Sequence, residues 1–138
     1  MEETMNRKLA SYILTAVLLS LGVVALAAQD AKNSSPNNTV TIEGLVRDIA
    51  CPIQNPKSTA TEFSMDCIIK CAKAGSPLGI LTKDGTIYVP VTESMPDTGQ
   101  QQLQRFAGKY VSATGKEFLR NGVHGIEIND IHAVDSVK

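Results

Sequence analysis

Two turn dipeptides between β-rich segments constrain the fold of this chain more than any other feature. They are Asp84-Gly85 and Asn121-Gly122. Asp-Gly and Asn-Gly readily adopt the left-handed backbone that a tight hairpin turn requires. The flanking segments are residues 78–81 and 86–91 for the first dipeptide, and residues 110–119 and 123–134 for the second. Because these segments are rich in β-branched residues, the sequence predicts two β-hairpins.

A fifth strand is expected over residues 40–48, with a sharp bend at Gly44. Gly115, inside its own segment, predicts a second bend. The alternation of apolar residues in the last segment shifts by one after Asn129-Asp130, which predicts a bulge there. Five strands of this kind predict a mainly β fold, a small closed or partly open barrel in which Val111 points inward.

Two short helices are predicted outside the strands. One covers residues 65–74, with Ser64 as its N-cap and Gly75 at its C-terminus. The other covers residues 99–106, where Leu103 and Phe106 are three residues apart and share one face. Residues 50–61 contain prolines and are expected to form a loop.

The first 28 residues resemble a targeting segment. Arg7 and Lys8 precede an apolar stretch over residues 9–28, which ends in Ala25-Leu26-Ala27-Ala28. This pattern is typical of a signal peptide cleaved after Ala27 or Ala28. An uncleaved membrane anchor is the alternative, because about 20 apolar residues can cross a bilayer. Under either interpretation the remainder is periplasmic or secreted, and only residues 9–28, if uncleaved, would contact a membrane.

The rest of the chain divides into a polar linker over residues 29–39 and a folded domain over residues 40–138. The chain has 13 Lys and Arg against 14 Asp and Glu, a net charge of -1. We therefore expect no nucleic-acid partner, since binding to a phosphate backbone needs a basic excess. The sequence contains no phosphate-binding loop, nucleophile elbow or H-E-x-x-H motif, so we expect no enzymatic activity.

The three cysteines, Cys51, Cys67 and Cys71, are the one group of residues that indicates chemistry. Cys67 and Cys71 are four residues apart, so they share one face of the predicted helix. A direct bridge between them would strain that helix. The preferred interpretation is a structural disulfide from Cys51 to Cys67 or Cys71, which clamps the loop to the helix and leaves the third thiol buried.

Two other interpretations of the cysteines stay open. In one, the three thiolates bind a soft metal, copper or zinc, with Met65 as a further candidate ligand. In the other, Cys67 is a redox-active thiol whose position in the first helical turn favours the thiolate. The two histidines, His124 and His132, are expected to be surface or turn residues and not ligands.

Two segments resemble a known group of proteins. Residues 106–116, F-A-G-K-Y-V-S-A-T-G-K, resemble the F-A-G-K-x-V-x-V-T-G stretch of bacterial exported OB-fold-like domains, and residues 125–131 resemble their final strand. Residues 67–78 are similar to a C-x3-C-x3-G-x-P segment in small exported bacterial proteins. Some of those carry a His shortly before the first cysteine, where this chain has residues 63–66, so no His ligand is implied here.

The resemblance covers residues 40–134 and implies a five-stranded OB-like barrel with one or two short helices. The sequence as a whole predicts an exported, non-enzymatic binding or interaction domain, clamped by a disulfide from Cys51, whose partner is an unidentified protein or small ligand. One alternative function is a periplasmic protein that binds copper or zinc through Cys51, Cys67 and Cys71. Another is a membrane-anchored accessory subunit of a larger complex.

Overall fold

The part of the chain that can be described is residues 38–138 without Met95, in a computed structural model. The expected signal peptide or anchor over residues 1–28, and nearly all of the linker over residues 29–39, lie outside these residues. Within residues 38–94 and 96–138, no helix combines the length and the apolar character needed to cross a membrane.

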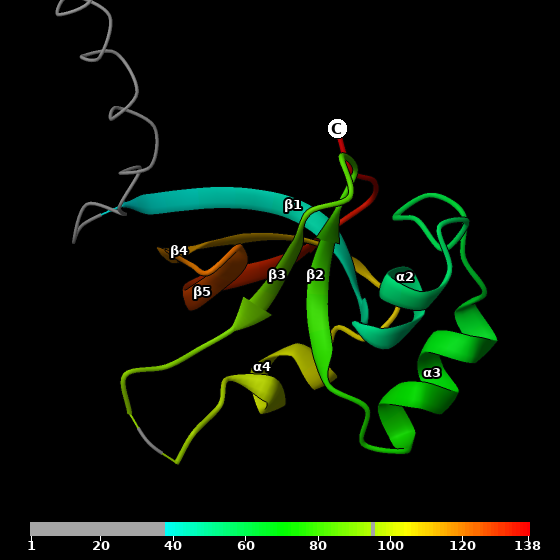
Figure 1. Ribbon diagram of the computed structural model, residues 1–138, viewed down its shortest axis with the longest axis horizontal. Helices are drawn as coiled ribbons and strands as arrows, with labels where there is room; N and C mark the ends of the chain where they lie inside the picture. The colour runs from blue at the N-terminus through cyan, green and yellow to red at the C-terminus, as the bar shows by residue number, and fades with distance from the viewer. Residues whose placement is uncertain (1–37, 95) are drawn as a thin grey trace, which may run out of the picture. The chain divides into compact units, whose positions relative to one another are not determined.

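The described residues form five strands and three helices, which confirms a mainly β fold. In chain order these elements are β1 (Thr39–Asp48), α2 (Ala50–Gln54), α3 (Met65–Lys73), β2 (Leu78–Thr82), β3 (Ile87–Pro90), α4 (Gln100–Gln104), β4 (Tyr110–Arg120) and β5 (Val123–Val134). Figure 1 shows α2 and α3 on the same side of the sheet, beside β1 and β2, and α4 near the end at which β2 begins.

The strands follow the hydrogen-bonded order β1-β2-β3-β5-β4, and β4 pairs again with β1. The pairing therefore closes on itself. Four of the five pairs are antiparallel, whereas β3 and β5 run parallel, with Tyr88 opposite His124. Gly44 lies where β1 passes from one neighbour to the other, because it is paired both with Thr82 of β2 and with Val111 of β4.

The turns and irregularities expected in the strands are present. Asn121 and Gly122 have φ angles of 51° and 77°, the two positive values that a two-residue hairpin turn requires. In the β4–β5 pair, Thr114 lies opposite Asp130 and Gly115 lies opposite Ile128. Asn129 is the extra residue, which confirms the bulge predicted at Asn129-Asp130 and places it opposite the step from Thr114 to Gly115.

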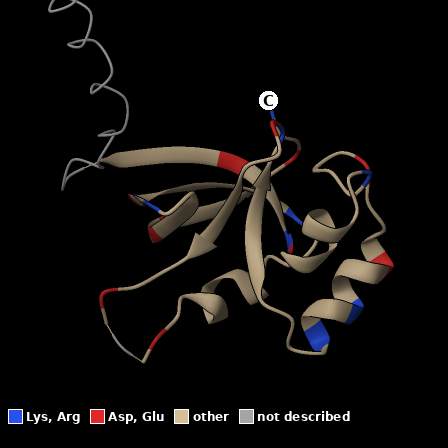
Figure 2. Cartoon of the chain, viewed as in Figure 1, with Lys and Arg blue, Asp and Glu red and all other residues tan. Residues whose placement is uncertain are grey.

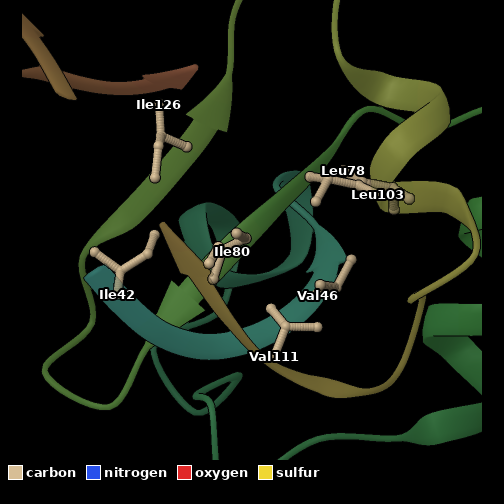
Figure 3. Close-up of a cluster of buried hydrophobic side chains, with 8 residues drawn as sticks. Ile42, Val46, Leu78, Ile80, Leu103, Val111 and Ile126 are labelled. Atoms are coloured by element: carbon tan, nitrogen blue, oxygen red, sulfur yellow. The ribbon is translucent and has the colours of Figure 1, made fainter. Parts of the chain in front are cut away.

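A hydrophobic core fills the inside of the sheet (Figure 3). Its buried members come from all strands except β3, and from α4: Ile42, Val46, Leu78, Ile80, Leu103, Val111, Ala113 and Ile126. Val111 has no exposed surface, which confirms that it points inward. The side-chain amide of Gln100 attaches α4 to β2, since its oxygen accepts from the Leu78 N–H (2.8 Å) and its nitrogen donates to the Leu78 carbonyl (3.0 Å).

A second, smaller cluster lies between the sheet and the connection from β1 to β2. Its buried residues are Leu45, Ala60, Ile68 and Leu81. Leu45 and Val46, neighbours on β1, are both fully buried, each in a different cluster. Because side chains alternate along a strand, β1 is covered on both faces at this point. The second cluster therefore holds α3 and the preceding loop against the sheet.

The helices differ from expectation in number, because residues 50–54 form α2 where a loop was expected. The physical reason is local: the Asp48 carboxylate accepts the backbone N–H of Cys51 at 2.8 Å, as a helix-capping side chain does. Pro52 lies in the first turn, where its missing N–H does no harm. In α3, Ser64 is the N-cap as predicted and accepts from the Cys67 N–H at 3.4 Å. The last helix, α4, is shorter than predicted.

Candidate metal centre

The structure brings Cys51, Cys67 and Cys71 together. Cys51 lies on α2, and Cys67 and Cys71 lie one turn apart on α3. Their three Sγ atoms all lie within 4.8 Å of one another. The grouping of all three thiols, which the metal interpretation requires, is therefore a property of the fold. A cluster of this kind is able to hold a metal ion, because thiolates are preferred ligands of soft metals.

All three cysteines are free thiols in the structure. No pair of them lies at disulfide-bonding distance, so the disulfide from Cys51 stays a prediction. The expectation that the third thiol is buried is wrong: Cys51 and Cys71 are half-buried and Cys67 is exposed. The reason is that the loop before α3 packs on Ile68 and the sheet through the second cluster, while the adjacent thiol face of α3 stays at the surface.

The loop between α2 and α3 is anchored to β4, and this anchoring determines where the two helices meet. The Tyr110 hydroxyl donates a hydrogen bond to the Ala60 carbonyl at 2.9 Å. The Tyr110 ring also contacts the Phe63 ring edge to face, with 6.2 Å between the centroids. Edge-to-face aromatic pairs are stabilising beyond the area that they bury. Phe63 directly precedes Ser64, the N-cap of α3, so the ring contact places the start of that helix.

A buried ion pair at the end of β1 lies beside the thiol cluster, and it was not predicted from the sequence. Arg47 and Asp48 are 3% and 1% exposed, with Nη2 of Arg47 and Oδ1 of Asp48 separated by 3.7 Å. Nη1 of Arg47 also donates to the Thr59 carbonyl at 3.4 Å. The Arg47 Nε and Asp48 Oδ1 atoms have no hydrogen-bond partner. Adjacent charged residues at the end of an otherwise apolar strand are the signal that could have identified the pair.

Asp48 also raises the pKa of the Cys51 thiol. A hydrogen bond to the Asp48 carboxylate, followed by burial and by the negative charge of Asp48, raises the pKa of Cys51; a smaller contribution comes from Cys67. A raised pKa favours the neutral thiol. In the metal-free protein at neutral pH, this favours the protonated thiol of Cys51. Binding of a metal would replace this proton, since metals bind the thiolate.

No fourth ligand joins the cluster among the described residues. The metal-ligating group found in residues 38–94 and 96–138 contains only the three cysteines. Met65, a candidate from the sequence, has its sulfur against Gly108, close enough that a Cβ there would collide with it. Its thioether therefore contacts the turn before β4.

The histidines belong to other parts of the sheet. His124 Nδ1 lies 3.1 Å from the Glu117 carboxylate, and its ring packs against Tyr88 with 5.1 Å between the centroids. His132 Nδ1 lies 3.3 Å from the carboxylate of Asp130. The bulge at Asn129 separates the two histidines, so they do not share one face of β5. Neither histidine belongs to the cysteine group.

A surface hollow of about 380 Å³ lies beside the cysteines. Cys51 and Cys67 line it, together with Arg47, Lys57 and Phe63 among other residues. Figure 2 shows both signs of charge on α3 and on the segment leading into it. The redox role considered for Cys67 stays a prediction; its backbone N–H is capped by Ser64, as expected for the first turn of α3.

Comparison with known proteins provides no identification. The chain matches no protein-family model, no curated protein and no solved structure. The function must therefore be inferred from the geometry of the site.

Proposed function

We propose that this protein binds one soft metal ion, copper(I) or zinc(II), through the thiolates of Cys51, Cys67 and Cys71. The observation that carries this proposal is the mutual distance of the three Sγ atoms, at most 4.8 Å. An ion about 2.3 Å from each sulfur requires the sulfurs to be about 4 Å apart. A contraction of less than about 1 Å, within reach of side-chain rotation, would therefore form the site.

The fold we propose is an OB-like barrel, and two features support it. The first is the closed strand order β1-β2-β3-β5-β4 with its single parallel pair. The second is the place of the cysteines, all on the connection between β1 and β2. OB-folds use the loop between their first two strands to contact ligands. The targeting pattern of residues 1–28 adds export to the proposal, so the metal would be bound outside the cytoplasm.

The geometry favours a metal over a structural disulfide. A disulfide from Cys51 would use two sulfurs and leave an accessible third thiol in an oxidising compartment, where thiols are readily oxidised. A metal site uses all three sulfurs. The interaction domain clamped by a disulfide is therefore the competing function, and the test below distinguishes the two. Among residues 38–94 and 96–138, no observation favours the membrane-anchored accessory subunit.

The test is metal binding by the full chain, reduced and purified anaerobically in detergent. We expect one equivalent of copper(I) or zinc(II) to be retained in competition with a chromophoric chelator. At a free metal concentration 100 times Kd, binding stabilises the folded state by about 2.7 kcal/mol. For a domain of this size Tm should then rise by on the order of 10 °C or more. Replacing any one of the three cysteines with serine should abolish most of this shift.

Met65→Leu is the matched control, because the sulfur of Met65 lies against Gly108 and not in the cluster. This variant should retain the wild-type metal affinity. Alkylation of protein purified in air can reveal the competing disulfide. If only one thiol is alkylated and the mass is lower by two hydrogen atoms, with no bound metal, the disulfide is correct and the metal proposal is wrong.

A further inference from the structure

One side of the thiol cluster faces the solvent. The hollow of about 380 Å³ is lined by Cys51 and Cys67, but not by Cys71. Cys67 is the exposed member of the cluster, whereas the other two are half-buried. A metal bound by the three sulfurs would therefore be approached across Cys51 and Cys67, with Cys71 behind it.

The donor set leaves one coordination position to an external ligand. A structural zinc site is closed by four protein ligands, whereas a site with three protein ligands keeps a position open. The cluster offers three cysteine sulfurs, and the carboxylates and histidines of the described residues do not complete it. Thiolates select copper(I), a soft ion. An incoming soft donor therefore does not have to displace a fourth protein ligand.

The walls of the hollow are charged, polar and apolar in turn, without an excess of one charge. Lys57 and Glu62 line it with opposite charges. Arg47 also lines it, but this side chain is only 3% exposed and is paired with Asp48. Phe63 supplies an apolar surface in the same wall. The walls therefore do not repel a thiol of either charge, and the softness of the metal selects sulfur as the incoming donor.

We infer that this hollow admits an external thiolate, which takes copper(I) from the cluster by ligand exchange; the inference rests on the proposed function. The sulfur of the external thiolate donates a lone pair to copper, and the bond from copper to Cys67 Sγ breaks. Further external donors then displace Cys51 and Cys71 in the same way. Each displaced cysteine leaves as a thiolate and takes a proton from water. Copper stays in the +1 state, and no electron is transferred. The protein is then a carrier that delivers its metal to thiols.

The experiment follows copper(I) transfer from the loaded full chain to an excess of bicinchoninate, with added thiol. Glutathione represents small thiols, and a decapeptide with one central cysteine represents a partner polypeptide. For an open site the transfer rate should rise linearly with the thiol concentration. Acceleration by glutathione alone would assign the hollow to small thiols, and equal acceleration by the decapeptide would extend the role to partner proteins.

Gln54→Trp tests whether the hollow is the route. Gln54 is exposed and lines the hollow, so an indole there should slow thiol-dependent transfer by about tenfold. Ile53→Trp is the matched control, since Ile53 is on the same helix, 69% exposed and outside the hollow. A transfer rate that does not depend on thiol, or an equal effect of both variants, overturns this inference and leaves copper binding intact. A chain that retains no copper overturns the proposed function itself.

Discussion

At the residue scale, Asp48 makes three interactions that matter for the cysteine cluster. It is paired with Arg47, accepts the backbone N–H of Cys51 and holds the thiol of that residue in its neutral form. The Asp48 side chain itself is only 1% exposed. Charges removed from water require a partner, because an uncompensated buried ion is strongly destabilising. Asp48 therefore links the stability of the domain to the geometry of the candidate metal centre.

Asp48→Asn should destabilise the metal-free protein by about 3–5 kcal/mol, because it leaves Arg47 buried without a counter-charge. Urea unfolding measures this difference. Asp66→Asn is the matched control: Asp66 is 76% exposed and its pair with Lys70, at 2.7 Å, is on the surface. Such pairs contribute little, so the control should change stability by less than about 0.5 kcal/mol. Equal losses in the two variants would contradict a structural role for the buried pair.

At the element scale, the strands present clearly different faces to the core and to solvent. Val111 of β4 is fully buried, whereas Val123 of β5 is 54% exposed at the start of its strand. Val111→Asp places an unpaired carboxylate in the core and should unfold the domain, a loss greater than about 4 kcal/mol. Val123→Asp should remain folded and lose less than about 1 kcal/mol. Thermal melts followed by circular dichroism would measure the stability of both variants. A normal melt for Val111→Asp would mean that the faces of β4 are reversed.

At the scale of the whole molecule, the stability of the metal-free fold depends on pH through Cys51. Its pKa is raised in the folded state, so the folded protein holds this proton more tightly than the unfolded chain. The resulting stabilisation is complete below the ordinary thiol pKa of about 8.5. It is lost as the pH rises through the raised value. The free energy of unfolding should therefore decrease at alkaline pH.

Urea unfolding of wild type and Cys51→Ala at a series of pH values from about 7 to 10 isolates this contribution. The wild type should lose more stability over this range than the variant, because only the wild type carries the perturbed thiol. Parallel curves for the two proteins would show that Cys51 titrates in the same way in the folded and unfolded chains.

Much of the fold follows from signals that act over a few residues. Asn121-Gly122 predicts its turn because two adjacent residues must adopt positive φ, and Ser64 predicts the start of α3 because a cap and its helix are neighbours. The bulge at Asn129 appears as a shift in alternation for the same reason. The sequence does not predict α2, because Asp48, whose side chain accepts the Cys51 N–H, belongs to a buried strand. Nothing in the local sequence marks that carboxylate as free to turn toward Cys51.

By itself, the sequence determined the β class, the two hairpins, the long helix and the identity of the three thiols, because each of these depends on neighbouring residues or on composition. Only the tertiary structure decided that β4 pairs with β1 and that β3 runs parallel to β5. It also decided that Cys51 lies beside Cys67 and Cys71, over a buried Arg47–Asp48 pair. The strand pairs and the approach of Cys51 to Cys67 and Cys71 join residues that are distant along the chain. They arise from the packing of the β1–β2 connection on the outer face of the sheet, where Leu45, Ala60, Ile68 and Leu81 exclude water together.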